Sequence, residues 1–152
     1  MIDHLTVKVS DYARSKPFYA GALKPLGYLP QMEFAAGAGF GVPGKPDLWI
    51  FQDPQNVRPM HFAFHTRDRK VVDAFHAAAL ASGGRDNGGP GIRKDYHPSY
   101  YAAFVYDPDG HNVEVVCHEA PGAAKRAARR KPAAARTRRP AAGKQAARKR
   151  KR

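Results

Sequence analysis

The sequence contains a single cysteine, Cys117, so no disulfide can form within the chain, which fits a reducing compartment. No apolar run approaches the ~18 residues of a membrane-spanning helix, and the N-terminus has no signal-peptide pattern. Residues 120–152 contain no aromatic and no branched aliphatic residue, so they cannot build a hydrophobic core. We therefore expect a cytoplasmic protein without a membrane span, whose folded domain is residues 1–119.

Acidic residues are also missing from residues 120–152, which contain 14 of the 26 Lys and Arg residues. The other 12 basic residues lie in 1–119 with all 13 acidic ones, so the net charge of +13 belongs almost entirely to this tail. Its like charges and its prolines predict disorder. Its Ala, Lys, Arg and Pro composition resembles the basic tails of linker histones and bacterial nucleoid proteins.

This composition predicts sequence-nonspecific binding to nucleic acid, and with it association with the nucleoid. A solubilising tail, or one that binds another polyanion or a membrane surface, is the alternative. The tail residues that we expect to contact phosphates are Lys125, Arg126, Arg129, Arg130, Lys131, Arg136, Arg138 and Arg139.

The folded part reads as an internal repeat with an offset of 57 residues. His4 aligns with His61, and Gly27 aligns with Gly84. In each copy a strand-like alternation is followed by an amphipathic helix that ends at a glycine, and then by short strand signals broken by Gly and Pro. Each copy therefore predicts the order strand, helix, strand, strand, strand.

Two copies of one such unit predict an α+β fold of two βαβββ modules, at about residues 1–56 and 57–119. Their strands would form a curved mixed sheet around an open cup, with the helices outside. The longer stretch in the second copy, from Arg85 to Pro98, is rich in Gly and Pro and is expected to be a loop.

Strand alternation also predicts which side chains face the cup. In the first strand Val7 and Val9 share the apolar face, which leaves His4 on the opposite one. The same reasoning places His61 and Glu114 on the cup face of their strands. Two imidazoles and a carboxylate from separate strands suit a divalent metal, and their chemistry does not choose among Fe, Mn, Zn, Ni and Co. Solvated polar residues on a half-exposed sheet are the alternative.

Three motifs carry a family resemblance: DHLTVKVSD near the start, MHFAFHT at the start of the second module, and DPDGHNVEVV near the end. They are similar to motifs of the vicinal oxygen chelate superfamily, the group of glyoxalases, bleomycin-resistance proteins and extradiol dioxygenases. The resemblance covers residues 1–118. It implies that His4, His61 and Glu114 are metal ligands and that the metal activates a small substrate through two neighbouring oxygens.

The sequence departs from glyoxalase I-like enzymes in one place, because Trp49 lies close to the position where they carry a carboxylate ligand. A His-His-Glu set is instead similar to that of extradiol dioxygenases and fosfomycin-modifying thiol transferases. The resemblance thus implies a lyase or isomerase, a thiol transferase or a dioxygenase. The alternative is a metal-free binding protein, as in the antibiotic-sequestering branch. The family resemblance also implies a homodimer, in which metal ligands could come from both subunits.

Several further residues are candidates for the site. Trp49 would cover a flat or apolar substrate if it lines the cup, and otherwise belongs to the core. His97 and Tyr101 flank the long loop of the second module, where they could bind substrate or act as acid or base, unless they are ordinary surface residues. His111 and His76 are expected at the surface.

Overall fold

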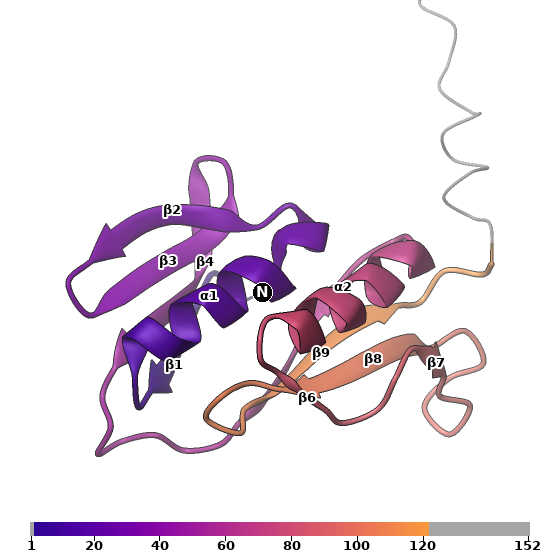
Figure 1. Cartoon of the computed structure of the whole chain (residues 1–152). Helices are drawn as coiled ribbons and strands as arrows, with labels where there is room; N and C mark the ends of the chain where they lie inside the picture. Colours follow the sequence, from indigo (N-terminus) through magenta and orange to yellow (C-terminus); the bar gives the residue numbers. More distant parts are fainter. Residues whose placement is uncertain (1, 122–152) are drawn as a thin grey trace, which may run out of the picture.

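The computed structural model describes residues 2–121 (Figure 1). The first module comprises β1 (Leu5–Val9), α1 (Tyr12–Ala22), the 3-10 helix η1 (Lys24–Leu26), β2 (Leu29–Phe34), β3 (Gly37–Val42) and β4 (Lys45–Gln52). The second module comprises β5 (His61–His65), α2 (Arg69–Ala81), β6 (Arg85–Asp86), β7 (Gly91–Ile92), β8 (Tyr101–Tyr106) and β9 (Asn112–Cys117). The predicted α+β class with two repeated modules is confirmed, and the expected loop of the second module contains the short strands β6 and β7.

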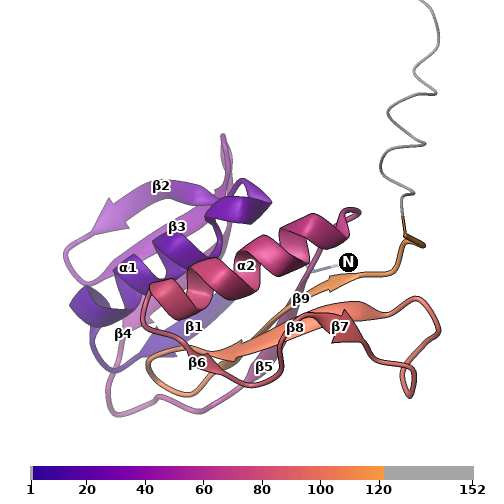
Figure 2. The same ribbon diagram turned by 45° about the vertical axis from the view of Figure 1, so that its right-hand side comes forward.

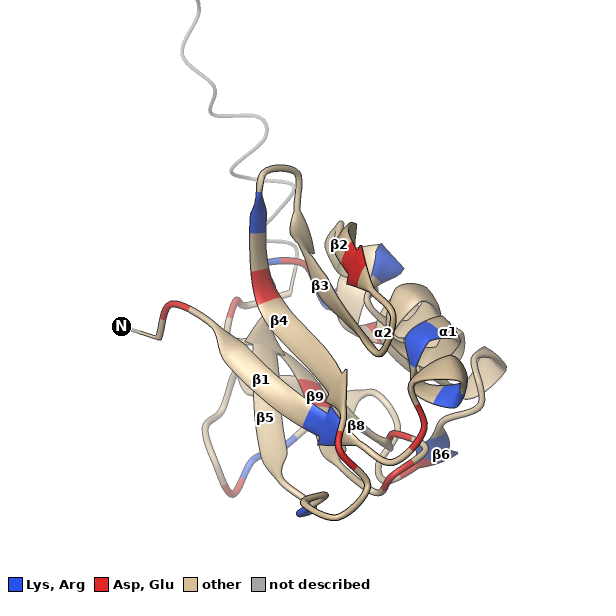
Figure 3. Cartoon of the chain, turned by 90° about the vertical axis from the view of Figure 1, so that its left-hand side faces the viewer, with Lys and Arg blue, Asp and Glu red and all other residues tan. Residues whose placement is uncertain are grey.

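Each module forms its own hydrogen-bonded sheet. The strand orders are β1-β4-β3-β2 and β5-β9-β8-β6, with β7 pairing to β8. In both sheets the first strand of the module runs parallel to the last, while the other pairs are antiparallel. The sheets are mixed, as predicted, and meet where β1 and β5 run past each other (Figure 3).

Both helices begin at an aspartate that occupies the same position in the repeat. The Asp11 side chain accepts from the backbone N–H of Arg14, and the Asp68 side chain accepts from that of Lys70. A carboxylate at this position satisfies a backbone N–H that the first helical turn leaves free. The two helices lie side by side on the same side of the sheets (Figures 1 and 2). None of the helices in residues 2–121 is long and apolar enough to cross a membrane.

One hydrophobic core runs through both modules beneath the helices. The alternation of β1 and β9 is as predicted, because Val7, Val9, Val113 and Val115 are all fully buried in this core, and Cys117 lies there too. The opposite faces of the strands, which point away from the helices, are therefore the cup faces. Other members of the core are Phe18, Tyr19, Leu23, Phe40, Leu48, Ile50, Val72, Phe75, Ala79 and Val105.

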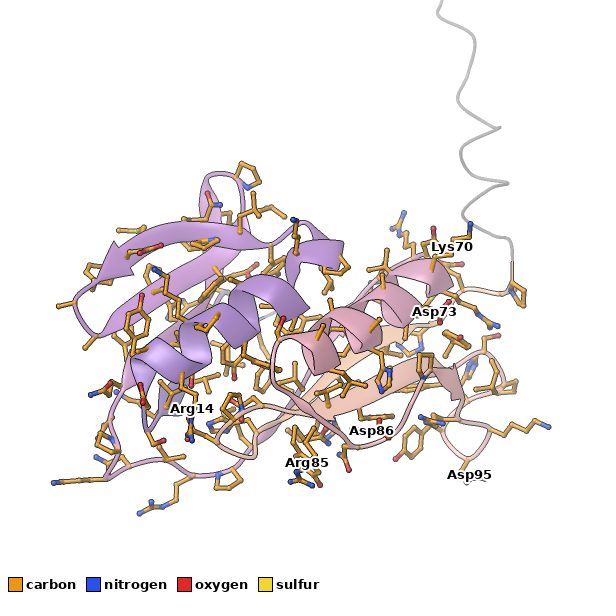
Figure 4. All side chains as sticks on the ribbon, viewed as in Figure 1. Arg14, Lys70, Asp73, Arg85, Asp86 and Asp95 are labelled. Carbon is orange, nitrogen blue, oxygen red and sulfur yellow. The ribbon has the colours of Figure 1, made fainter. Side chains whose placement is uncertain are left out.

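The turn between β8 and β9 docks the second module onto the first. The carboxylate of Asp109 accepts a hydrogen bond from the backbone N–H of Ser10 at 3.0 Å and one from the Arg14 guanidinium at 2.7 Å. Figure 4 shows Arg14 projecting from α1 toward this turn. The DPDG motif thus positions a buried carboxylate against the start of α1, in addition to reversing the chain.

His111 lies directly after this turn, and its prediction as a surface residue is wrong, because it is only 1% exposed. Its ring Nδ1 accepts from the backbone N–H of Met60 at 3.3 Å, and its Nε2 lies 2.9 Å from the carbonyl oxygen of Lys8. Since a carbonyl only accepts, Nε2 carries the proton. The ring therefore joins β1, the start of β5 and the β8–β9 turn.

Candidate functional site

Glu114 is a nearly buried carboxylate in the middle of β9, with an exposed fraction of 2%. Its neighbours Val113 and Val115 face the core, so its own side chain points to the cup face. Oε1 accepts from the Tyr100 hydroxyl at 2.6 Å, and Oε2 lies 2.8 Å from Nε2 of His61. Both carboxylate oxygens thus have a partner, which is how the strand tolerates a buried acid.

The Tyr100 hydroxyl is a permanent donor in this arrangement. Burial, together with the hydrogen bond to Glu114, raises the pKa of Tyr100 to about 12. The hydroxyl therefore stays protonated across the physiological range and holds Oε1 in place.

His61 is the exposed end of this hydrogen-bond chain. Its side chain is 54% exposed, although its Nε2 contacts the buried carboxylate. An ionised carboxylate only accepts hydrogen bonds, so Nε2 must carry a proton. The other ring nitrogen, Nδ1, is then free to accept a proton from a bound molecule.

Two cavities meet at His61. The first, here named the loop cavity, has a volume of about 430 Å³ and lies between the cup face of β8 and β9 and the loop that contains β7. Its lining residues are His61, Asn87, Gly88, Arg93, Tyr96, Phe104 and Asn112. The second, named the junction cavity, has a volume of about 550 Å³ and lies between the start of β1 and strand β5. A molecule in either cavity would lie beside the His61 ring.

His4 borders the junction cavity together with His61, but it does not join the His61–Glu114 pair. It precedes β1 by one residue, its side chain is 59% exposed, and its Nδ1 donates to the Asp3 carboxylate at 3.0 Å. This hydrogen bond lowers the pKa of Asp3. Within residues 2–121 no three His, Cys, Asp or Glu side chains converge closely enough to hold a metal ion. The structure therefore brings together two of the three predicted ligands.

Trp49 lies on the cup face of the first sheet and outside the hydrophobic core. Its ring is stacked on Phe51, with centroids 6.2 Å apart, and Phe34 lies 6.4 Å away. A Cβ on Gly39 of β3 would come within 2.6 Å of the indole, so this glycine makes room for the ring. Trp49 borders neither the loop cavity nor the junction cavity, and its predicted contact with substrate stays a prediction.

The tyrosine that contacts Glu114 is Tyr100, whereas the candidate predicted from the sequence is Tyr101. Tyr101 lies on the helix face of β8, where its hydroxyl donates to Asp73 at 2.7 Å and the Arg69 guanidinium lies over its ring. Figure 4 shows Asp73 on α2, the helix that covers this face. Tyr101 therefore does not join the His61–Glu114 pair.

His97 is exposed in the turn before β8 and borders neither cavity. Its Nδ1 accepts from the backbone N–H of Ser99 at 3.1 Å, a contact that stabilises the turn. The eight basic tail residues selected above, from Lys125 to Arg139, lie outside the described residues.

Arg93 lines the loop cavity but is not among the candidates that the sequence predicts. It follows a stretch with glycines at 88, 89 and 91. Glycines mark a stretch where the backbone can pass close to a neighbouring side chain, and this pattern could have identified Arg93 as a candidate.

Comparisons with known proteins agree with this architecture. Residues 1–115 match the model of a family described as the Glyoxalase/Bleomycin resistance protein/Dioxygenase superfamily. The chain is 28% identical over 131 residues to the uncharacterized protein YqjT of Bacillus subtilis (strain 168), covering 74% of this chain and 95% of that protein.

Solved structures show the same fold. A glyoxalase/bleomycin resistance protein from Albidiferax ferrireducens T118 superposes with a TM-score of 0.63 at 28% identity, over 75% of this chain and 95% of that one. A glyoxalase-related enzyme from Fulvimarina pelagi superposes with a TM-score of 0.60 at 19% identity, over 77% and 87% of the two chains, and so shows a likeness of fold alone.

Proposed function

Because this chain belongs to the Glyoxalase/Bleomycin resistance protein/Dioxygenase superfamily, we propose that it is an enzyme that binds a small molecule beside His61 and moves a proton on it. The observation that carries the proposal is the hydrogen-bond chain from Tyr100 through Glu114 to His61. It ends in a half-exposed imidazole at the meeting point of two cavities.

In the proposed reaction His61 is the general base. Its Nδ1 takes a proton from a carbon next to a carbonyl group of the substrate, which leaves an enolate and an imidazolium. The imidazolium then returns a proton, either the same one or one exchanged with solvent, to the enolate at the same or the neighbouring carbon. Glu114 fixes the tautomer and stabilises the imidazolium that forms, because its Oε2 accepts from Nε2 throughout. Tyr100 keeps the carboxylate oriented. This chemistry corresponds to the lyase or isomerase branch of the sequence-based prediction.

The family resemblance implies a metal centre held by His4, His61 and Glu114. A neutral imidazole and a carboxylate are suitable donors, but they form a pair at hydrogen-bond distance, and His4 is directed to Asp3. Three donors on one ion are needed for a stable site with open positions. Within one chain the residues therefore do not fit a resident divalent metal, and no step of the proposed reaction uses one.

The test is hydrogen–deuterium exchange on carbon, catalysed by the full chain. Hydroxyacetone, glyceraldehyde and phenylpyruvate are incubated in D₂O, and loss of the proton next to the carbonyl is followed by NMR with chelator present. We expect exchange above the buffer rate on at least one compound, and a decrease of about 10²–10⁴-fold in His61→Asn. His76→Asn is the matched control, because that imidazole also pairs with a carboxylate, Asp86, but borders neither cavity.

Each other result contradicts the proposal in a specific way. If His61→Asn catalyses exchange as fast as the wild type, His61 is not the general base. Absence of exchange on all three compounds, with saturable binding of any of them, supports the metal-free binding protein instead. Stoichiometric metal that is lost in both His4→Ala and His61→Ala supports the His-His-Glu metalloenzyme, assembled within a chain or across a homodimer.

Nucleic acid binding by the tail is a separate prediction, tested by comparing salt-dependent binding of the full chain with that of residues 1–119.

A further inference from the structure

The loop cavity has a lining that is polar and carries positive charge without any acid. None of its seven lining residues is Asp or Glu, and Arg93 is its one Lys or Arg. The nearest carboxylate of the proposed site, Glu114, is held by Tyr100 and His61. A guanidinium that faces a cavity without a counter-charge is a recognised binding element for oxyanions.

The backbone is built closely around this guanidinium. One Nη of Arg93 donates to the carbonyl oxygen of Gly89 at 2.7 Å, and the guanidinium carbon lies 5.3 Å from the centroid of the Phe104 ring. A Cβ on Gly88 would lie 3.1 Å from one Nη, and a Cβ on Gly91 would lie 3.3 Å from the other. Glycine at both positions thus lets the chain wrap around Arg93 and fix its orientation.

Most donors of Arg93 remain available. Guanidinium has five N–H groups, and Gly89 uses one of them. None of the ion pairs in residues 2–121 includes Arg93. Tyr96 and Phe104 line the same cavity, and its volume lies in the range of about 300–1,000 Å³ that is typical of small-molecule sites.

We infer that the loop cavity binds a small organic carboxylate with a flat or apolar body, and that Arg93 holds its carboxylate group. The planar fork of guanidinium matches two carboxylate oxygens, while Phe104 and Tyr96 contact the body of the ligand. This inference deepens the proposed function and rests on it for the reaction, because a molecule in the loop cavity lies next to His61.

The inference is tested by titrating the full chain with benzoate, benzamide and phenyl phosphate at physiological salt, using isothermal calorimetry. Benzamide has the shape of benzoate without its charge, and phenyl phosphate carries a tetrahedral anion. We expect saturable benzoate binding with a Kd below about 5 mM, at least about tenfold weaker binding of the other two compounds, and at least about tenfold weaker benzoate binding in Arg93→Gln. Arg85→Gln is the matched control, because that guanidinium is also stacked on a ring, Tyr106, but does not line the cavity.

The possible results separate this inference from the proposed function. Benzoate binding that is absent, unchanged in Arg93→Gln, or matched by benzamide overturns the inference, and tighter binding of phenyl phosphate overturns the choice of carboxylate. If Arg93→Gln unfolds, Arg93→Lys decides, since it keeps the charge without the fork and should weaken benzoate binding by at least about threefold. The titration measures binding without turnover, so its result on the carboxylate site does not depend on deuterium exchange at His61.

Discussion

Nε2 of His111 donates to the carbonyl oxygen of Lys8 across 2.9 Å, a contact between residues 103 positions apart in the chain. The same ring accepts from Met60, so one buried imidazole satisfies backbone groups of both modules. We expect His111→Ala to lower the free energy of unfolding by about 2–4 kcal/mol, because two hydrogen bonds are lost and their buried partners stay unsatisfied. Urea unfolding measures the change.

The control for this prediction is His97→Ala, since the exposed His97 ring accepts one hydrogen bond, from the backbone N–H of Ser99. We expect a loss of less than about 1 kcal/mol there. Equal losses in the two variants would show that His111 does not hold the modules together.

The carboxylate of Asp109 should make the free energy of unfolding depend on pH. Burial would raise its pKa, but hydrogen bonds from Ser10 and the charge of Arg14 outweigh this effect and hold the pKa below its usual value. A lowered pKa in the folded state means that the stabilisation is fully present above the unfolded pKa of about 3.9 and is lost as pH falls through the folded value.

Asp109→Asn should therefore lower the free energy of unfolding by about 1–2 kcal/mol at neutral pH, and the difference from the wild type should shrink as the pH falls below the unfolded pKa of about 3.9. Urea unfolding at neutral and acidic pH provides the measurement. If the difference stays constant with pH, the charge of Asp109 does not contribute to the stability of the fold.

The repeat and the alternation of the strands could be predicted because both are local patterns. The buried valines of β1 and β9 come from a period of two, and the same period places Glu114 on the cup face. His61 meets Glu114 because β5 and β9 are parallel neighbours, as the repeated module requires.

Other features depend on contacts that no local pattern contains. The burial of His111 follows from the docking of a turn onto another module, so the polar sequence around it was misleading. Tyr101 pairs with core-facing Cys117 across the β8–β9 ladder, so it faces α2, and Tyr100 is the neighbour that reaches Glu114. His4 precedes the first ladder residue, so strand alternation does not control its side chain.

The two adjacent tyrosines give a matched pair of variants. Tyr100→Phe removes the donor to Oε1 of Glu114, so we expect it to lower the deuterium exchange rate by about tenfold and the stability by about 1 kcal/mol. Tyr101→Phe removes only the bond to Asp73 and should lose similar stability with no change in exchange. Exchange rates and urea unfolding of both proteins test the pair, and equal exchange rates in the two variants would exclude a role of Tyr100 in positioning Glu114.

Gly39→Ala tests the aromatic cluster on the cup face of the first sheet. The new Cβ would lie 2.6 Å from the Trp49 ring, so the indole must move off Phe51. We expect a stability loss of about 1–3 kcal/mol and a shifted emission maximum, which is readily assigned because Trp49 is the single tryptophan. Gly89→Ala, where the nearest atom is 3.8 Å away, should leave the emission unchanged. Unchanged emission in Gly39→Ala would mean that the ring already lies elsewhere.

The apolar core that passes beneath both helices has a consequence for any attempt to divide the chain. A chain cut between β4 and β5 would separate each module from the other half of the shared apolar interior, so neither fragment should fold by itself. Mixed in solution, the two pieces should restore one another, which would make this duplicated architecture a candidate for fragment complementation.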